Sequence, residues 1–293
     1  MATFKLSAFA DEAGATLDEQ IIALKENGIK FIEPRFVNGK GILDLTDAEL
    51  SQMAKALAEN GIKVNALGSP IGKYDIDAPF EEHLEKFKRA LEVAKALGTD
   101  KIRMFSFFVG QDSLVEKRDE VIRRLSVMVE MAKAEGILLC HENESLIYGQ
   151  MPEEVKDLLT TVDGLYGIFD PANYRMNNAD VIEGINATLI NLAYLHIKDA
   201  EYKTQTILPA GEGEGRIGEV IDIVNDKSNE VVYLTLEPHL NAFEAYKTID
   251  THELRNTRVF ATTRESFDFA TNALKALLTK HGYKETEVGT WKK

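Results

Sequence analysis

The sequence predicts a single α/β domain over residues 1–293, folded as a closed (β/α)8 barrel with parallel strands. One observation is a repeated unit, in which an amphipathic helix ends at a glycine and a short apolar strand follows. A second is that eight such strands alternate with helices. A third is that no nucleotide-type glycine loop follows the first strand, which argues against a doubly wound sheet. The repeat is visible in ALKENGIKFIE (23–33), ALAENGIKVNA (56–66), VAKALGTDKIRM (93–104) and AKAEGILLCHE (132–142).

The predicted elements follow one another without a linker or a low-complexity segment. Strands are expected at 4–10, 30–36, 63–68, 101–107, 136–142, 166–170, 192–198 and 231–237. Helices are expected at 17–27, 47–60, 80–97, 117–135, 152–161, 178–189, 218–226 and 264–281. Glycine tolerates the left-handed conformation of a helix cap, which explains Gly28, Gly61, Gly98 and Gly136.

Three segments do not fit the repeat. Residues 241–263 are too long for a plain connection, so they are expected to be either a lid or a surface excursion. The loop PAGEGEGRIGEV (209–220) could hold a phosphate at a helix N-terminus, or it could be a packing turn, because Glu212 and Glu214 would repel the anion unless Arg216 offsets them. Residues 283–293 are charged and are expected to form a loosely held tail.

The composition argues against several classes of protein. No run of about 18 apolar residues and no secretory signal is present, so we expect a cytoplasmic protein that does not enter a membrane. The formal net charge of −14 opposes binding to nucleic acid. The single cysteine, Cys140, excludes an intramolecular disulfide and is expected to be a buried apolar residue. A homo-oligomer is left open.

Four consecutive predicted strands each bring one metal-competent side chain to their C-terminal end, where barrels of this kind place their chemistry. These side chains are Glu142, Asp170, His196 and Glu237. Each alone has a simpler explanation, such as a solvated strand end, an Asx turn or a buried histidine. Together, three carboxylates and an imidazole favour a divalent cation, because so much negative charge is otherwise costly in a partly dry cleft.

The motifs LLCHENE, IFDPAN, YLHIKD and LTLEPH on strands five to eight resemble the sugar phosphate isomerase/epimerase superfamily of xylose-isomerase-like TIM barrels. The resemblance implies that Glu142, Asp170, His196 and Glu237 bind one divalent metal ion. This ligand set allows manganese, cobalt, magnesium or zinc, because carboxylates suit harder ions and imidazole softer ones, and manganese is favoured. It also implies a small carbohydrate or ketose-like substrate whose carbonyl the metal polarises. Glu142 and Glu237 match the acid/base pair that forms and quenches a metal-stabilised enediolate. The implied enzyme is an isomerase or epimerase, with an inosose-dehydratase-like lyase as the alternative.

Further residues are expected to contact the substrate: Glu33, Glu144, Asn173, Lys198 and His239. Ketohexose epimerases have a histidine at the position of Asn173 and an arginine at that of Tyr202, which argues against ketohexose 3-epimerase activity. Lys198 and Lys203 could instead supply a cationic donor. His141 has the opposite strand parity to Glu142 and is expected to pack outward.

Two other functions are less well supported by the sequence. An apurinic endonuclease would need a cluster of two or three zinc ions, further histidines and a basic face, whereas this chain has six histidines and a net charge of −14. A non-catalytic sugar-binding barrel would keep the fold without a metal-dependent reaction.

Overall fold

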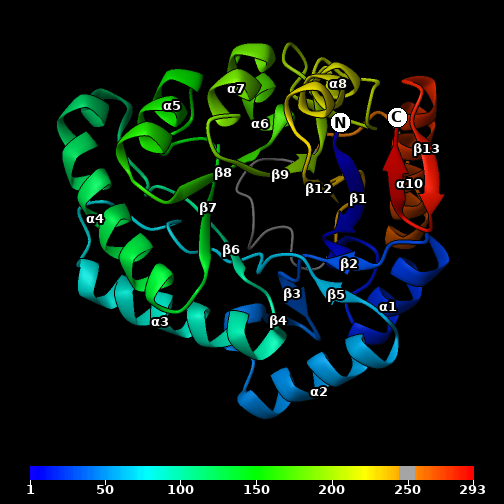
Figure 1. The fold of residues 1–293 in the computed structure, drawn as a ribbon, viewed down its shortest axis with the longest axis horizontal. Coiled ribbons are helices and arrows are strands. Elements are labelled where there is room, and N and C mark those ends of the chain that lie inside the picture. The colour runs from blue at the N-terminus through cyan, green and yellow to red at the C-terminus, as the bar shows by residue number, and fades with distance from the viewer. Residues whose placement is uncertain (244–254) are drawn as a thin grey trace.

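The computed structural model describes residues 1–243 and 255–293 and confirms the parallel barrel (Figure 1). Strands surround the centre of Figure 1, and helices form the outer layer. In chain order the barrel strands are β1 (Thr3–Ala8), β2 (Phe31–Ile32), β5 (Lys63–Val64), β6 (Lys101–Met104), β7 (Leu138–Glu142), β8 (Leu165–Phe169), β9 (Leu192–Ile197) and β12 (Val231–Leu236). Each falls within or overlaps a predicted strand.

Parallel pairing follows the chain order around the barrel. β1 pairs with β2 and β12, and the pairs continue from β12 through β9, β8 and β7 to β6. β2 pairs in turn with β5. Just beyond β5, a parallel bridge between Leu67 and Ile102 closes the ring. There the Leu67 N–H donates to the Lys101 carbonyl at 2.8 Å, and the Arg103 N–H donates to the Leu67 carbonyl at 2.9 Å.

The predicted helices are present in the outer layer. They are α1 (Leu17–Glu26), α2 (Asp47–Glu59), α3 (Phe80–Leu97), α4 (Leu114–Ala134), α5 (Pro152–Thr161), α7 (Val181–Thr188), α8 (Ile217–Lys227) and α10 (Thr263–Lys280). Thr16 and Thr46 begin α1 and α2 with capping boxes, in which threonine and glutamate side chains each accept a backbone N–H of the other residue. The glycine cap of α3 is confirmed, since Gly98 has a φ of 70°.

Several short elements follow the strand ends and were not predicted. They are the 3-10 helices η1 (Ala10–Glu12), η2 (Ile42–Asp44) and η3 (Gln111–Ser113), the helix α6 (Pro171–Met176), the hairpin of β3 (Phe36–Val37) with β4 (Lys40–Gly41), and the hairpin of β10 (Asp199–Glu201) with β11 (Thr206–Leu208). Such elements are too short to show a hydrophobic period of their own. The segment 241–263, expected to be either a lid or a surface excursion, includes residues 244–254, which lie outside the described residues, so both alternatives stay predictions.

The prediction of a loose tail at 283–293 is wrong, because this segment forms a hairpin that extends the sheet. β13 (Lys284–Glu287) pairs with β14 (Thr290–Lys292), and β14 pairs antiparallel with β1 through Trp291 and Phe4. The short β2 covers only the C-terminal part of this edge of β1, which leaves the first part for β14. Tyr283 and Trp291 are only 1% and 5% exposed, and their burial anchors a segment that is otherwise mostly charged or polar.

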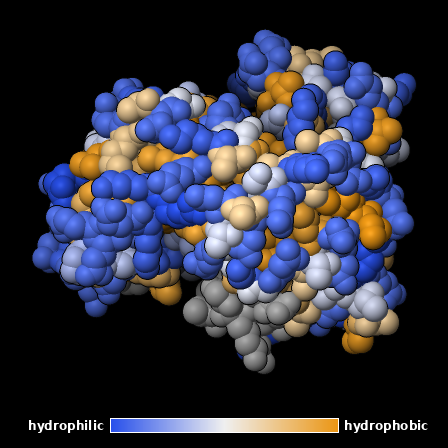
Figure 2. Space-filling view, turned by 90° about the horizontal axis from the view of Figure 1, so that it is seen from below, coloured by the Kyte–Doolittle hydropathy of each residue, from blue (hydrophilic) through white to orange (hydrophobic). Residues whose placement is uncertain are grey.

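Among the described residues, no helix is both long and apolar enough to cross a bilayer. Hydrophilic residues cover most of the face shown in Figure 2, and apolar residues form only small groups there. The prediction that Cys140 is a buried residue is confirmed, because its side chain is fully buried. It lies two residues before Glu142, on the same side of β7. Burial raises the pKa of the Cys140 thiol above its ordinary range.

Trp291→Ala should lower the free energy of unfolding by about 3 kcal/mol, the scale of removing a buried aromatic side chain. The reason is that the hairpin would lose the apolar contact that holds it against the barrel. Urea denaturation followed by circular dichroism measures the change. Val288→Ala, at a side chain 54% exposed in the same hairpin, is the control and should change the free energy by less than about 0.5 kcal/mol. Equal stability of the two variants would contradict the anchoring role of Trp291.

Candidate metal centre

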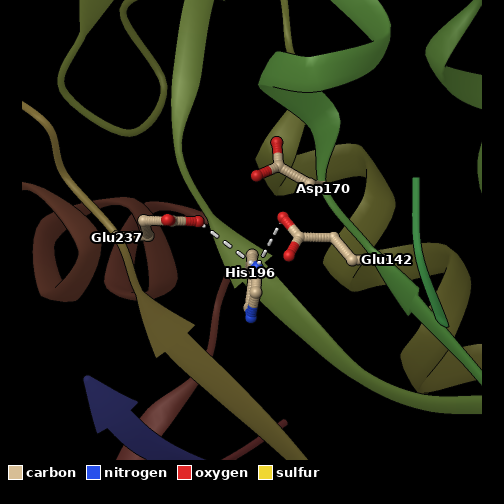
Figure 3. A group of neighbouring side chains, drawn as sticks. All are labelled: Glu142, Asp170, His196 and Glu237. Atoms are coloured by element: carbon tan, nitrogen blue, oxygen red, sulfur yellow. Dashed lines mark hydrogen bonds and ion pairs between the residues drawn. The ribbon is translucent and has the colours of Figure 1, made fainter. Parts of the chain in front are cut away.

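The structure brings the four predicted ligand residues together at the C-terminal ends of β7, β8, β9 and β12. One potential ligand atom from each of Glu142, Asp170, His196 and Glu237 lies within 4.8 Å of those of the others. All four residues are at most 2% exposed. In Figure 3, Glu142 and Glu237 approach His196 from opposite sides, and Asp170 lies between and above them. The geometry is that of a possible cation site, and metal binding itself stays a prediction.

Strand positions explain why these side chains converge. Glu142 is the last residue of β7, His196 lies within β9, and Glu237 directly follows β12. Asp170 directly follows β8 and caps α6, where its Oδ1 accepts the Asn173 N–H at 2.9 Å. Asp170 can therefore cap α6 and also belong to the four-residue ligand group, because one carboxylate oxygen accepts the hydrogen bond of the cap and the other faces the centre.

His196 is held in one orientation by carboxylates at both of its ring nitrogens. Its Nδ1 lies 3.1 Å from Glu142 Oε1 and 3.3 Å from Glu237 Oε2. Its Nε2 lies 3.4 Å from Glu33 Oε2, and Glu33 Oε1 accepts the Tyr194 hydroxyl at 2.8 Å. A proton on Nε2 donated to Glu33 would leave the Nδ1 lone pair facing the other carboxylates, which is the usual arrangement of a metal-binding histidine.

Two asparagines position the carboxylates of Glu142 and Asp170. The Asn143 side chain accepts the Asp170 N–H and donates to the Asp170 carbonyl, both at 2.9 Å. The Asn173 Nδ2 donates to Glu142 Oε1 at 3.3 Å and to the Asn143 carbonyl at 2.8 Å. The ends of β7 and β8 are thereby tied together, which fixes the distance between these two carboxylates.

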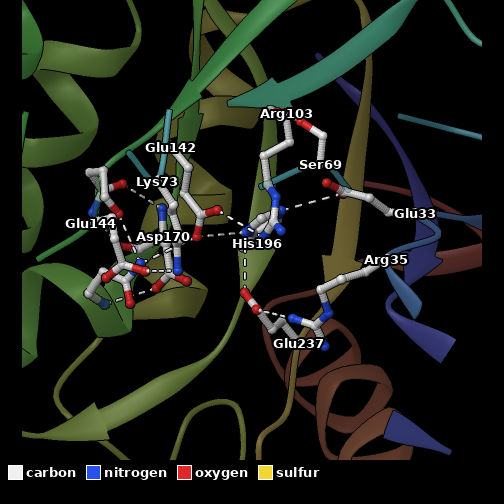
Figure 4. Close-up of polar contacts among 12 residues, drawn as sticks. Glu33, Arg35, Ser69, Lys73, Arg103, Glu142, Glu144, Asp170, His196 and Glu237 are labelled. Carbon is white, nitrogen blue, oxygen red and sulfur yellow. Dashed lines mark hydrogen bonds and ion pairs between the residues drawn. The ribbon is translucent and has the colours of Figure 1, made fainter. Parts of the chain in front are cut away.

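Three buried cations surround the same centre (Figure 4). Arg103 Nη1 donates to Glu142 Oε2 at 3.2 Å, and Arg35 Nη1 donates to Glu237 Oε1 at 2.8 Å. Lys198 Nζ lies 3.0 Å from Asp170 Oδ2 and 3.6 Å from Glu237 Oε2. Each glutamate therefore keeps one oxygen on an arginine and turns the other toward His196.

The charge of this region fits a divalent cation. Its six buried carboxylates are those of Asp11, Glu12, Glu33, Glu142, Asp170 and Glu237. Against them stand the three buried cations Arg35, Arg103 and Lys198, so carboxylates outnumber these cations by three within the described residues, before the histidines are counted. Asp170 Oδ2 and Glu237 Oε2 are buried and accept no hydrogen bond from a described residue. Carboxylate oxygens and one imidazole suit Mn²⁺ and similar ions.

The pKa values reflect this imbalance. Burial raises the pKa of Asp170 to about 6, because Lys198 offsets only part of the cost of the buried charge. Burial also opposes ionisation of Glu142, but His196 and Arg103 hold the pKa of that carboxyl at about 2. For His196, burial alone would lower the pKa, whereas Glu142 and Glu33 raise it well above its ordinary value. A bound metal ion would compete with this proton, since a ligating histidine is neutral.

Of the five residues predicted to contact substrate, two lie within the cluster and three lie around it. Asn173 and Lys198 lie within the cluster, whereas Glu33 lies behind His196, as a partner of its Nε2. His239 Nε2 lies 3.4 Å from Glu12 Oε1 and 3.5 Å from Glu237 Oε1, beside the cluster. Glu144 lies farther out and accepts from Lys73 at 3.2 Å.

Other residues of the predicted motifs lie away from the centre. His141 is buried, and its Nε2 lies 2.9 Å from Ser106 Oγ on the other side of β7, in agreement with its predicted parity. Tyr202 is 41% exposed. Lys203 is exposed and makes no ion pair with a described residue, so only Lys198 of the two lysines is placed as a cationic donor.

The sequence interpretation missed Asp11, Glu12, Arg35 and Arg103. Arg103 is a charged residue inside an apolar strand, and Arg35 lies two residues after Glu33, so strand parity could have indicated both. Asp11 and Glu12 follow β1 within η1, and both contact Arg35. Their role depends on a contact between the first and second units of the barrel, which the local pattern does not show.

The glycine loop after β9 is filled by a carboxylate of the chain itself. The N–H groups of Gly211, Gly213 and Gly215 donate to the Asp199 carboxylate at 2.9, 3.0 and 2.8 Å. Added Cβ atoms at Gly213 and Gly215 would lie 2.4 and 2.6 Å from Asp199 Oδ1, which explains the need for glycine there. The phosphate alternative is therefore wrong for this loop, and the packing-turn alternative holds.

The fold and the site together define a (β/α)8 barrel with a candidate metal centre at the carboxyl ends of its strands. The chain belongs to the xylose isomerase-like TIM barrel family, whose model matches residues 21–252. No curated protein sequence matches the chain.

Solved structures with the same fold include proteins of different activities. A probable 3-DHS dehydratase, AsbF from Bacillus anthracis, has 16% identity and a TM-score of 0.72, over 92% of this chain and 98% of its own. An L-ribulose 3-epimerase has 18% identity and a TM-score of 0.70, over 96% and 97%. The IOLI protein, solved with a bound zinc atom, has 16% identity and a TM-score of 0.72, over 94% and 99%. At these identities the likeness shows the fold alone.

Asp170→Ala and His196→Ala should each lose bound metal while the barrel stays folded, because both side chains lie at strand ends outside the main apolar core. The loss of affinity should exceed the roughly 10- to 100-fold effect typical of residues that only support a ligand. Metal content after loading with Mn²⁺ and gel filtration, with circular dichroism as the folding check, measures it. Glu144→Gln is the control and should keep its metal. Normal metal content in both alanine variants would refute the ligand assignment.

Proposed function

We propose that the protein is a divalent-metal-dependent isomerase or epimerase of a small carbohydrate or ketose-like substrate, with Glu142 and Glu237 as acid and base. The main support is that these two glutamates approach one centre from opposite sides of His196, each with its second oxygen on a separate arginine (Figures 3 and 4). The epimerases among proteins of the same fold agree with this proposal.

A divalent ion held by Glu142, Asp170, His196 and Glu237 would supply Lewis-acid polarisation of a substrate carbonyl. Manganese is the favoured ion, and cobalt, magnesium and zinc are compatible with the donor set. The carboxylate of Glu142 or Glu237 would take the proton from the carbon beside the carbonyl, which leaves an enediolate. The other glutamate, after taking a proton from solvent, can return it to the opposite face of that carbon, which gives an epimer. Protonation of the neighbouring carbon, with the hydroxyl proton passing from one oxygen to the other, gives an isomer.

A lyase is the second candidate because of Lys198. Its ammonium lies 3.0 Å from Asp170 Oδ2 and 3.6 Å from Glu237 Oε2, inside the same cluster. It could donate a proton to a β-hydroxyl, which would then leave as water after a glutamate removes the carbon-bound proton. The fold is shared with a probable dehydratase, which agrees with this alternative.

Glu142→Gln and Glu237→Gln should each lower turnover by roughly 10²- to 10⁴-fold, the usual contribution of general acid–base catalysis. An amide keeps the shape and one acceptor oxygen but cannot take the proton. Exchange of substrate protons with solvent deuterium, screened over ketoses and inososes, measures the first step before the product is known. Exchange could survive in one variant after net turnover is lost, because each stereochemical sense uses one glutamate as base.

Glu153→Gln is the matched control, since Glu153 is an exposed glutamate in the first turn of α5 and lies outside the ligand group. It should retain most of the activity. Near wild-type turnover in either Glu142→Gln or Glu237→Gln, with metal still bound, would refute the two-glutamate mechanism. A metal-loaded protein that exchanges no substrate proton would instead favour a sugar-binding barrel.

A further inference from the structure

A pocket of about 510 Å³ lies against the candidate metal centre, between the ends of β2 and β5 and the helix α3. Two of its lining residues, Arg35 and Arg103, contact Glu237 and Glu142. The lining contains five basic residues and only two acidic ones, in a chain whose net charge is −14. The basic residues are Arg35, Lys73, Lys86, Arg89 and Arg103. The lining is therefore richer in basic than in acidic residues, and two of its basic residues, Arg35 and Arg103, are shared with carboxylates of the metal centre.

The three arginines of this pocket differ in how fully their donors are used. Arg35 donates from each of its three nitrogens to carboxylates. Arg89 donates to Asp47, Glu92 and the Leu45 carbonyl. Arg35 and Arg89 are therefore occupied by partners from the protein itself.

Arg103 is only 4% exposed, yet its guanidinium makes a single hydrogen bond to a described residue, from Nη1 to Glu142 Oε2 at 3.2 Å. Its Nε is buried and has no hydrogen-bond partner among the described residues. An unsatisfied donor on a buried charged group is costly, so such a group generally has a partner. Because Arg103 lines the pocket, a bound ligand is the natural source of that partner.

The guanidinium of Arg103 is also held in place by aromatic rings. Its Cζ lies 4.9 Å from the centroid of Phe9 and 5.1 Å from that of Phe105. Lys73 Nζ lies 4.7 Å from the centroid of the same Phe105 ring, so a second cation lines the pocket. Lys73 also pairs with Glu144 at 3.2 Å (Figure 4). Planar guanidinium groups held in this way bind carboxylate or phosphate through two parallel hydrogen bonds.

We propose that this pocket binds an anionic group of the substrate through Arg103, with Lys73 beside it. The inference rests on the proposed function and narrows it, because the substrate becomes an acidic carbohydrate whose carboxylate or phosphate lies in the pocket while its carbonyl lies at the metal centre. The neutral ketohexoses lack this group, which agrees with the departures at Asn173 and Tyr202.

Isothermal titration calorimetry of the Mn²⁺-loaded protein tests the proposal with three ketoses that differ only at C6. D-fructuronate has a carboxylate there, D-fructose 6-phosphate has a phosphate, and D-fructose has a hydroxyl. We expect one charged ketose to bind roughly ten- to a hundredfold more tightly than fructose, the scale of a hydrogen bond to a charged group. Which one does so distinguishes a carboxylate from a phosphate. The preference should weaken as salt is added.

Arg103→Met should abolish the preference for the charged ketose, whereas Arg89→Met removes the same charge from the same pocket and should leave the preference intact. If Arg103→Met does not fold by circular dichroism, Arg103→Lys takes its place, because it keeps the charge but loses the planar fork, and it should reduce the preference. Equal binding of the three ketoses, no binding of either charged ketose, or a preference that survives the change at Arg103 would overturn the proposal.

Deuterium exchange in the same samples separates this proposal from the proposed function. Rapid exchange with fructose, without any preference for a charged ketose, would leave the isomerase or epimerase assignment intact and refute the anion pocket. Tight binding of a charged ketose through Arg103, without exchange in any ketose, would support the pocket and count against the enzymatic assignment.

Discussion

The excess of buried negative charge at the carboxyl end of the barrel is the constraint on which the rest of the site depends. Six carboxylates share this region with three cations, and the group is almost entirely shielded from water. An unpaired buried ion costs several kcal/mol, so each of these side chains must be offset by a neighbour. The hydrogen bonds and ion pairs that Arg35, Arg103, Lys198 and Asn173 make with these carboxylates are that offset. The buried carboxylates still outnumber the buried cations, and one divalent ion would offset most of this difference in charge.

The two arginines give the site two unlike sides. Arg35 is fully engaged with carboxylates from η1 and from the end of β12, so it joins the first and last units of the barrel. Within the described part of the chain, the Arg103 guanidinium donates a hydrogen bond to Glu142 alone, and it otherwise faces aromatic rings and the pocket. The Arg35 side of the site is therefore structural, while the Arg103 side keeps hydrogen-bond donors that the described residues do not use. The candidate ligand residues stand at strand ends, whereas the pocket is lined mainly by the segments that follow β2 and β5 and by α3. Because these two parts of the barrel can vary separately, a metal centre of this kind could serve different substrates.

Much of the fold could be predicted from the sequence, because each unit repeats a local pattern of helix, glycine and strand. The exceptions were elements stabilised by distant contacts. Residues 283–293 have few apolar side chains, yet Trp291 reaches β1 across nearly the whole chain and turns a predicted tail into a hairpin. The glycine loop after β9 likewise has the composition of an anion site, and Asp199 occupies it. The tertiary structure alone shows which residue binds to the C-terminal segment or to the glycine loop.

The sequence by itself determined the eight-unit barrel and the four residues Glu142, Asp170, His196 and Glu237, because strand parity and position along a strand decide which side chains reach the interior at its carboxyl end. The tertiary structure alone decided what surrounds them. It placed Glu33 behind His196, Arg35 and Arg103 on the two glutamates, and Lys198 between Asp170 and Glu237. These pairings join strands far apart in the chain, and their strength depends on burial and on distances that only the closed barrel sets.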